Sequence, residues 1–325
     1  MRMIASLSLD LDNQWSYMKT HGDAGWETYP SYLGKVVPRI LEFLDERGLT
    51  ITFFIVGRDA VMPQNRQAIM SIAAAGHEIG NHSFNHEPWL HLYSKREIID
   101  ELEQTEDAIN DITGCRTFGF RGPGYSLSPT VLEVLVERGY EYDCSTLPTY
   151  IGPLARAIYF LRSKEMSKDD RQKRKQLFGK FSQGFQSISP YKWDVAGKTI
   201  IEIPVTTMPV FKVPIHASYI IYLSSISRAL SKAYWNVVMR FCSLTSTKPS
   251  ILLHPLDFLD GDDVPELRFF PGMNVSWSKK QTILSEVLDI LGTKFEIVNM
   301  RRHAEIFASE TLPHAGLKPS WKAAT

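Results

Sequence analysis

Short apolar runs and longer stretches with helical spacing alternate along most of the chain. Apolar runs typical of buried strands lie at residues 3–9, 50–56, 199–205 and 250–253, and we also interpret the shorter, more polar segments 77–80, 117–120, 140–143 and 294–298 as strands. Apolar residues at helical spacing lie between them, at residues 31–47, 64–75, 94–113, 129–138, 215–243 and 278–291. Strands that alternate with helices predict an α/β fold with a largely parallel sheet.

The alternation is interrupted between residues 150 and 198. Within this stretch, residues 162–180 contain eight lysines and arginines against three aspartates and glutamates, and they follow the apolar residues 158–161. This pattern indicates either a solvated insertion or a basic element at 158–180 that contacts an anionic membrane surface or a phosphate-bearing substrate. We expect one domain over residues 1–308 with an insertion at 150–198, followed by a flexible tail over 309–325.

Composition narrows the class of protein. Hydrophobic residues make up 44% of the chain and charged residues 22%, which is typical of a soluble globular protein. The formal net charge is zero, so nothing in the overall charge favours a nucleic-acid partner. Cys115, Cys144 and Cys242 are scattered, which fits a reducing compartment. The apolar start at residues 3–9 is too short for a signal peptide, so we expect a cytoplasmic protein, at most peripheral to the inner face of the membrane.

Candidate chemical groups follow the predicted strands. They are Asp10 and Asp12 after the first strand, His82 and His86 after the third, Arg121 after the fourth and His254 after the strand at 250–253. Active sites of parallel α/β folds gather at the carboxyl ends of strands. An isolated pair of histidines four residues apart is as often a pair of ordinary surface or strand-end histidines as it is part of a metal site. One aspartate with two histidines, however, is a ligand set that leaves coordination open for water or substrate, as in catalytic zinc sites.

The Asp10-Leu11-Asp12 motif alone fits other enzymes. In haloacid-dehalogenase-like phosphatases the first aspartate is a nucleophile, but Asn13 follows here and the chain has no compact Lys and Asp-Asp set of the kind that family needs. Metal-dependent glycosyltransferases also use Asp-x-Asp, but they need a nucleotide site, and the sequence shows no motif for one.

Four motifs in order give the chain a family resemblance. They are Asp10-x-Asp12, His82-Ser83-x-x-His86, Arg121-x-Pro123-Gly124 and Leu252-Leu253-His254. Together they resemble the NodB-homology polysaccharide deacetylases, carbohydrate esterase family 4, over residues 3–300. The resemblance implies a distorted (β/α) barrel of about seven strands. It also implies metal-dependent hydrolysis of an N-acyl group from a sugar.

The resemblance also implies a role for each matching residue. The implied metal ligands are Asp12, His82 and His86. Asp10 matches the general base, Arg121 the arginine that orients it, and His254 the general acid. The backbone N–H of Gly124 matches the oxyanion donor. The implied cofactor is a divalent metal, with zinc favoured and cobalt or iron as alternatives.

Two features differ from the commonest family pattern. Leu11 separates the two aspartates and Asn13 follows them, as in the cytoplasmic branch of the family. The family's Asp-x-x-x-Trp segment has no obvious match, so Asp143 and Trp193 are candidates, with residues 202–206 as a pocket wall.

The remaining histidines and aromatics receive simpler interpretations. We expect His77 to be a strand residue or a neighbour that supports the metal ligands, and structural or surface roles for His21, His91, His216, His303 and His314. Tyr125, Trp15 and Trp26 are candidates for stacking on sugar faces, with packing favoured for the two tryptophans.

The sequence therefore predicts a metal-dependent deacylase. Its expected substrate is an N-acylated amino sugar or a sugar-containing glycan or glycolipid precursor. Two alternatives remain: a cyclic amide or imide hydrolase of the same fold, and an inactive glycan-binding module. The intact metal-ligand set argues against a metal-free amide hydrolase, and the presence of both Asp10 and His254 argues against an inactive module.

Overall fold

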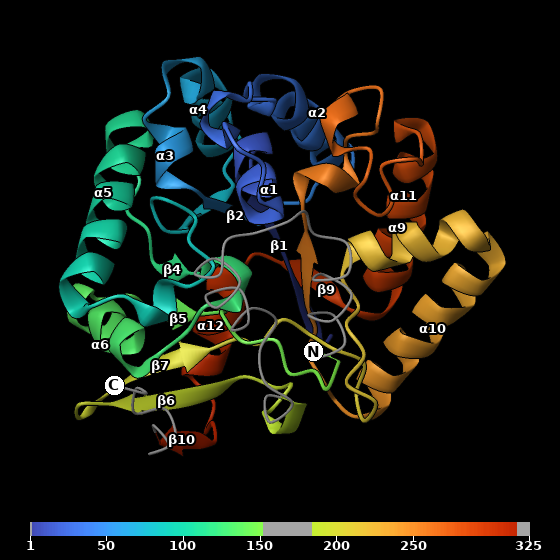
Figure 1. The fold of residues 1–325 in the computed structure, drawn as a ribbon. Helices are drawn as coiled ribbons and strands as arrows, with labels where there is room; N and C mark the ends of the chain where they lie inside the picture. The colour runs from blue at the N-terminus through green and yellow to red at the C-terminus, as the bar shows by residue number, and fades with distance from the viewer. Residues whose placement is uncertain (1, 152–183, 317–325) are drawn as a thin grey trace.

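A mainly parallel sheet runs through the computed structural model, which describes residues 2–151 and 184–316 (Figure 1). The ten strands of this part of the chain have the order β10-β6-β7-β5-β4-β3-β2-β1-β8, and β9 pairs with β1. Their bounds are β1 Ile4–Leu11, β2 Thr52–Ile55, β3 Glu78–Asn81, β4 Gly119–Phe120, β5 Tyr142–Asp143, β6 Tyr191–Val195, β7 Lys198–Glu202, β8 Ser250–Leu253, β9 Glu296–Val298 and β10 His314–Gly316. Only the β6–β7 pairing among these strands is antiparallel.

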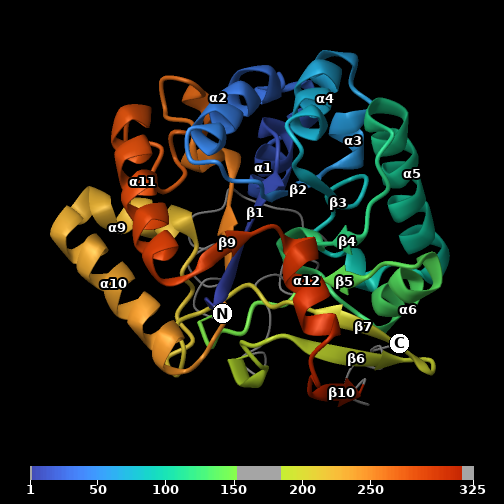
Figure 2. The same ribbon diagram turned by 180° about the vertical axis from the view of Figure 1, so that it is seen from behind.

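Helices surround most of the sheet (Figures 1 and 2). Their bounds are α1 Gln14–His21, α2 Leu33–Asp45, α3 Gly57–Ala60, α4 Arg66–Ala74, α5 Lys95–Thr113, α6 Pro129–Arg138, α9 Ala217–Ile226, α10 Arg228–Leu244, α11 Trp277–Lys294 and α12 Met300–Ala308. The long helix α5 begins at a capping box formed by Ser94 and Glu97, and it ends at Gly114 in the left-handed conformation. In the described part of the chain, no helix combines the length and the apolar character needed to cross a bilayer.

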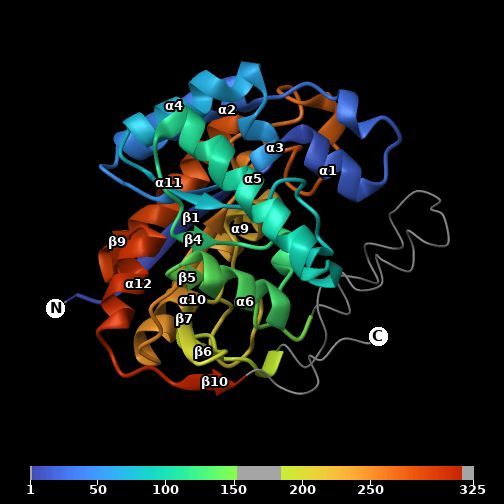
Figure 3. The ribbon, with the colours of Figure 1, turned by 90° about the vertical axis from the view of Figure 1, so that its left-hand side faces the viewer.

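Strand β1 is the centre of the sheet. All eight of its residues are buried, because helices cover both faces of the sheet around it. It pairs in parallel with β2, β8 and β9, and the register places Leu9 beside both Phe53 and Leu253. The N-terminus lies on one side of the molecule and α1, which follows β1, lies on the other (Figure 3). The carboxyl ends of the parallel strands therefore open on the side of α1.

The predicted α/β architecture is confirmed, and the structure adds three details to the prediction, while the predicted domain bounds stay a prediction. The sheet has ten strands rather than about seven, and no pairing in the described chain joins β8 to β10 to close a barrel. Strand β6 lies inside the predicted insertion at 150–198, where alternating residues of 191–195 are buried against the sheet. The predicted tail from residue 309 contains β10, which pairs with β6. The segment 158–180 and residues 317–325 lie outside the described residues.

The apolar stretch at 215–243 also differs from the prediction. It forms two helices, α9 and α10, rather than one. The break falls at Ser227, which has an extended backbone and whose hydroxyl accepts a hydrogen bond from the Leu230 N–H. A serine that caps a new helix in this way ends the preceding one.

The tight packing of β4 against β5 leads to a stability prediction. A Cβ at Gly119 would lie 2.0 Å from Cζ of the buried Tyr142, whose hydroxyl donates a hydrogen bond to Glu78. We expect Gly119→Ala to lower the unfolding free energy by roughly 1–3 kcal/mol in urea denaturation, because the strand must shift. Gly34→Ala in α2 is the matched control, since no atom lies within 4 Å of the added carbon. Equal stability of both variants would contradict this packing.

Candidate active site

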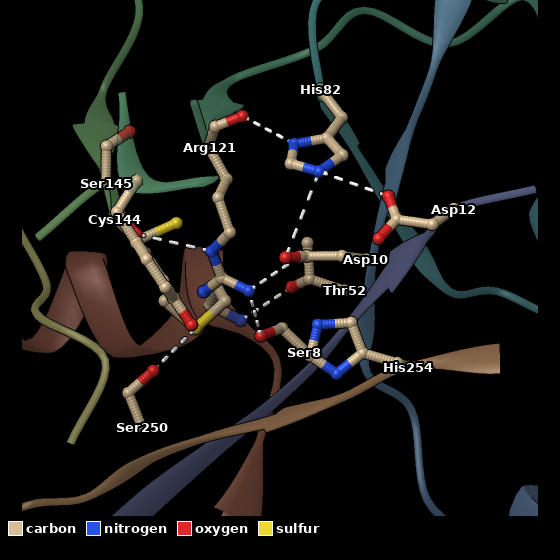
Figure 4. A network of polar contacts seen from close by, with 12 residues as sticks. Ser8, Asp10, Asp12, Thr52, His82, Arg121, Cys144, Ser145, Ser250 and His254 are labelled. Carbon is tan, nitrogen blue, oxygen red and sulfur yellow. Dashed lines mark hydrogen bonds and ion pairs between the residues drawn. The ribbon is translucent and has the colours of Figure 1, made fainter. Parts of the chain in front are cut away.

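Three side chains that could hold a metal ion meet beyond the carboxyl ends of β1 and β3. Oδ1 of Asp12 lies 3.0 Å from Nε2 of His86 and 3.5 Å from Nε2 of His82. The ligand atoms of the three residues all lie within 4.8 Å of one another, and all three side chains are buried. Figure 4 shows Asp12 and His82 facing each other across this point. The structure therefore brings together the ligand set expected from the sequence.

The donor chemistry of this cluster fits a divalent ion. Nδ1 of His82 lies 2.6 Å from the carbonyl oxygen of Arg121, which only accepts, so this nitrogen carries the proton. The lone pair on Nε2 of His82 then points toward Asp12. Oδ1 of Asp12 is buried and accepts no hydrogen bond from the described residues. A buried carboxylate oxygen that faces two imidazole nitrogens is an environment that a cation would satisfy.

The pKa shifts of Asp12 and His82 also favour a cation in this cluster. Burial acts to raise the pKa of Asp12, but interactions with His86 and His82 outweigh it and hold that pKa far below its usual range. Burial acts to lower the pKa of His82, but the carboxylates of Asp10 and Asp12 raise it overall. Both shifts show that the site favours positive charge beside Asp12, whether as a proton or as a metal cation.

The loop that carries His86 is held in a tight conformation by α5. His86 and Ser83 have left-handed backbones, with φ of 50° and 59°, which is uncommon for residues other than glycine. The buried Glu101 on α5 accepts hydrogen bonds from the backbone N–H groups of Phe84 and Asn85, both at 2.8 Å. Glu101 thus positions the loop of His86, a role that no motif around Glu101 indicated.

A buried ion pair lies beside the ligand cluster. Nη1 of Arg121 lies 2.8 Å from Oδ1 of Asp10, and the arginine side chain is fully buried. The guanidinium also donates to Oγ of Ser8 and to the carbonyl of Cys144. The second oxygen of Asp10 lies 3.9 Å from Nε2 of His82 (Figure 4). Asp10 is therefore oriented by Arg121 on one side and faces the ligand cluster on the other.

His254 reaches the same place from β8. The register of β1 with β8 pairs Leu9 with Leu253, so the next residues, Asp10 and His254, are neighbours across the sheet. The backbone N–H of His254 donates to Asp257, and Oγ of Ser218 donates to the other oxygen of Asp257 at 2.7 Å. Ser218 also lies 3.5 Å from Nδ1 of His254. The imidazole is thus anchored at the edge of the site.

The turn after β4 needs glycine at position 124. Gly124 has a left-handed backbone with φ of 58°, and a Cβ there would lie 3.2 Å from Cβ of Pro88. The N–H groups of Tyr125 and Ser126 make the described hydrogen bonds of the turn, to Gly122 and Pro123. The N–H of Gly124 takes no part in these bonds, as an oxyanion donor would require.

The structure corrects one histidine assignment. His216 is neither a surface residue nor remote from the site, because its Nε2 lies 3.2 Å from the hydroxyl of Tyr125. The ring centroids of His216 and His254 are 6.3 Å apart. Burial, together with the positive charges of His254 and Arg121, lowers the pKa of His216 to about 3, so its imidazole is neutral near pH 7. Its position just before α9 carries no motif that the sequence could have revealed.

Asp143 and Trp193, the candidates for the family's Asp-x-x-x-Trp segment, take part in hydrogen bonds near the turn at Gly122. Nε1 of Trp193 donates to Glu202 at 3.0 Å, and Ser145 donates its hydroxyl proton to Asp143 while it accepts the Gly122 N–H. Burial, followed by the charge of Asp143, raises the pKa of Glu202 well above its usual range. Asp143 therefore supports the turn at Gly122 through Ser145 and does not contact Arg121 directly in any described hydrogen bond.

The two tryptophans pack beside the ligand cluster, whereas the remaining histidines have other partners. Trp15 is buried, and its ring lies 5.5 Å from that of Trp26 and 6.4 Å, edge-on, from that of His86. The remaining histidines bond to nearby protein groups: His21 to Asp23, His77 to the Ile51 N–H, His91 to Ser126, His303 to Ser6 and His314 to Asp194.

Comparisons with known proteins agree with the fold and the motifs. Residues 22–142 match the polysaccharide deacetylase family model. The peptidoglycan deacetylase of Helicobacter pylori is 27% identical over 158 residues, which is 46% of this chain and 52% of that protein. The peptidoglycan-N-acetylmuramic acid deacetylase PdaA of Bacillus subtilis is 32% identical over 111 residues, 34% of this chain and 41% of that protein. The chain thus spans about half or less of these curated relatives.

A solved structure extends the likeness to nearly the whole chain. A protein of Mycobacterium smegmatis, assigned provisionally to the polysaccharide deacetylases, superposes with a TM-score of 0.62 at 19% identity. The superposition covers 98% of this chain and 96% of that protein. At this identity the likeness concerns the fold, and it confirms the deacetylase-type fold expected from the sequence.

Asp59 lies beneath the ligand cluster in an unusual environment. Its Oδ1 accepts hydrogen bonds from Nδ2 of Asn13 at 2.7 Å and from Nε1 of Trp15 at 2.9 Å. Its Oδ2 is buried and has no hydrogen-bond partner among the described residues. Burial raises the pKa of Asp59 to about 7, although these two hydrogen bonds act against the rise.

The raised pKa predicts a pH-dependent stability difference. Between pH 4 and pH 7 folded Asp59 keeps a proton that the unfolded chain loses, so its contribution to the unfolding free energy falls as pH rises, by up to about 1.4 kcal/mol per pH unit. Asp59→Asn removes this contribution. In chemical denaturation with a metal chelator present, the stability of the variant relative to wild type should rise up to pH 7 and then level off. Asp262→Asn, whose side chain is 93% exposed, should show no such trend; a flat difference for Asp59→Asn would contradict the assignment.

Proposed function

We propose that the chain, which matches the polysaccharide deacetylase family model over residues 22–142, removes the N-acyl group, with acetyl favoured, from an amino sugar by metal-dependent hydrolysis. The observation that carries this proposal is the contact between two groups of residues. The cluster of Asp12, His82 and His86 lies against the buried Asp10–Arg121 pair, with 3.9 Å between His82 and Asp10. Amide hydrolysis needs a site for an activated water and a base within reach of it.

In the proposed site, Asp12, His82 and His86 hold the metal, for which zinc is favoured and cobalt or iron are alternatives. When bound, a divalent ion makes water more acidic and polarises a carbonyl group. Asp10 takes the proton of the attacking water, because the guanidinium of Arg121 orients its carboxylate toward the ligand cluster.

Two further residues act on the substrate in this proposal. The backbone N–H of Gly124 stabilises the oxyanion of the tetrahedral intermediate, a contribution of roughly 3 kcal/mol in comparable enzymes. His254 protonates the leaving amine, a contribution of about 10²–10⁴ in rate. Asp257 fixes the backbone of His254, and Ser218, which donates to Asp257, lies 3.5 Å from Nδ1 of the His254 ring.

The substrate class follows the relatives in this proposal. Two of them are named as peptidoglycan deacetylases, which supports an N-acetylated amino sugar in a glycan or glycan precursor. We also propose a cytoplasmic location, supported by the three cysteines being free thiols. Contact of residues 158–180 with a membrane or a phosphate-bearing glycolipid rests on the charge of that segment in the sequence.

Metal content tests the ligand assignment directly. We expect purified wild-type protein to hold about one equivalent of a zinc-like metal by mass spectrometry, because the three side chains form one ligand set for one ion. His82→Ala/His86→Ala should hold none. His314→Ala is the matched control, since this exposed histidine pairs with Asp194 away from the site. A wild-type protein that stays metal-free after reconstitution would favour a metal-free cyclic amide hydrolase instead.

Acetate release tests the acid–base assignment. With N-acetylglucosamine oligomers and soluble peptidoglycan fragments as substrates, we expect Asp10→Asn and His254→Ala each to lower kcat by at least about 10²-fold, because each removes one proton transfer. Glycan binding should be retained in both variants, and His314→Ala should match wild type. Wild-type protein that binds these glycans and releases no acetate would instead support the inactive binding module.

A further inference from the structure

The exposed apolar side chains of the described residues gather in one part of the chain. Nine of the fourteen large exposed hydrophobic residues fall within residues 210–244. They include Ile226 and Val210, each 69% exposed, and Leu244, which is 82% exposed. Scattered single residues of this kind are normal on protein surfaces, but a concentration in one region marks an interaction site.

On α9 and α10 these side chains form stripes. Tyr219, Tyr222 and Ile226 are spaced by three and four residues along α9, so they share one face of that helix. Leu230, Val237 and Leu244 are spaced by seven residues along α10 and share a face there. The buried faces of both helices pack into the core. The two helices lie at the margin of the molecule (Figures 1 and 2).

A strained loop adjoins these helices. Val210 and Lys212 have left-handed backbones with φ of 70° and 56°, which is a costly conformation for a β-branched valine. The loop is held in place by hydrogen bonds from Thr149 to the Lys212 carbonyl and from Nζ of Lys212 to the Gln186 carbonyl, both at 2.8 Å. The ring of Phe211 lies 5.9 Å from that of Phe241 on α10, so the loop is continuous with the helix surface.

The charged side chains of this region are all basic. Residues 203–256 contain no aspartate or glutamate, although the whole chain has equal numbers of acidic and basic residues. The same stretch contains Lys212, Arg228, Lys232, Arg240 and Lys248. Lys232 and Arg240 are exposed on α10, and no ion pair of either is found among the described residues. Glu286 of α11 pairs with Arg228, and the hydrogen bond and charge of Arg228, together with the charge of Lys232, lower the pKa of Glu286. Lys248, just after α10, pairs with Glu310.

We propose that residues 209–213 and the outer faces of α9 and α10, here called the apolar–basic surface, bind an anionic lipid bilayer. Aliphatic side chains would enter the acyl boundary and tyrosines would lie at headgroup level, where their apolar rings and polar hydroxyls are both satisfied. Lys232 and Arg240 would meet lipid phosphates, an attraction that each basic residue strengthens near an anionic leaflet.

The positive charge of this surface favours an anionic bilayer over a second copy of the chain as its partner. In a symmetric dimer the same patch faces itself, so Lys232 and Arg240 would be brought near identical positive charges. Anionic headgroups neutralise these charges instead. The surface also reaches the active site, because the ring of Tyr219 lies 5.4 Å from that of His216. A bilayer bound here would lie beside the site, and this inference does not depend on the proposed hydrolysis.

Vesicle sedimentation with the full chain tests the proposal. We expect binding to vesicles of phosphatidylcholine with phosphatidylglycerol, weaker binding to phosphatidylcholine alone, and loss of the difference at high salt. Val210→Ser/Phe211→Ser and Lys232→Glu/Arg240→Glu should each weaken binding to anionic vesicles by at least about tenfold. Met70→Ser/Leu92→Ser is the matched control, because these residues are comparably exposed elsewhere, at 41% and 48%.

Three outcomes would overturn the proposal. The first is no binding to either vesicle by wild-type protein that retains its thermal transition. The second is equal binding by wild type and both surface variants, which would also be seen if residues 162–180 alone bound lipid. The third is a lipid-free dimer in light scattering that Val210→Ser/Phe211→Ser abolishes. Acetate release from soluble substrate is measured in parallel and should be unchanged in the surface variants, so failure of the proposed hydrolysis and failure of lipid binding are distinguishable.

Discussion

The site depends on one fully buried positive charge. Arg121 has no access to solvent, so its guanidinium must be compensated within the protein, and Asp10 provides the opposite charge. The same residue uses its carbonyl to fix the tautomer of His82 and its side chain to bond with Ser8 on β1 and the carbonyl of Cys144 after β5. A single arginine therefore couples Asp10 to His82, a metal-ligand candidate, and links β1 to the end of β5.

Around this pair, the site is held by carboxylates that act at a distance from the ligand cluster. Glu101 holds the loop of His86, Asp257 holds His254, and Asp143 supports the turn of Gly124 through Ser145. Each is buried and accepts hydrogen bonds from backbone N–H groups or hydroxyls, which satisfies the carboxylate without a second charged partner. Buried acids of this kind fix loops that would otherwise sample many conformations. They therefore keep His86, His254 and Gly124 in a fixed arrangement.

The sequence predicted the parts of the site that follow strands and missed the parts that depend on distant packing. Asp10 and His254 were identifiable because each follows an apolar run long enough to be recognised as a strand, and His82 because it stands four residues before His86. Glu101 lies on α5 and His216 just before α9, at positions that any polar residue could occupy, so no local pattern marked them. The three-residue strand β10 is too short to show periodicity, and its existence depends on pairing with β6. Local patterns thus gave the architecture, while long-range contacts decided its edges.

The pairing of β1 has a consequence for how the protein folds during synthesis. Strand β1 precedes all of its partners in the chain, and β2 can pair with one of its edges early. Its other partners, β8 and β9, begin only at residues 250 and 296. Until these strands are synthesised, an edge of β1 that is buried in the folded protein keeps unsatisfied backbone groups, a state prone to wrong pairing with other chains. The nascent chain should accordingly rely on chaperones until β8 is available, and Asp10 and His254 come together only then.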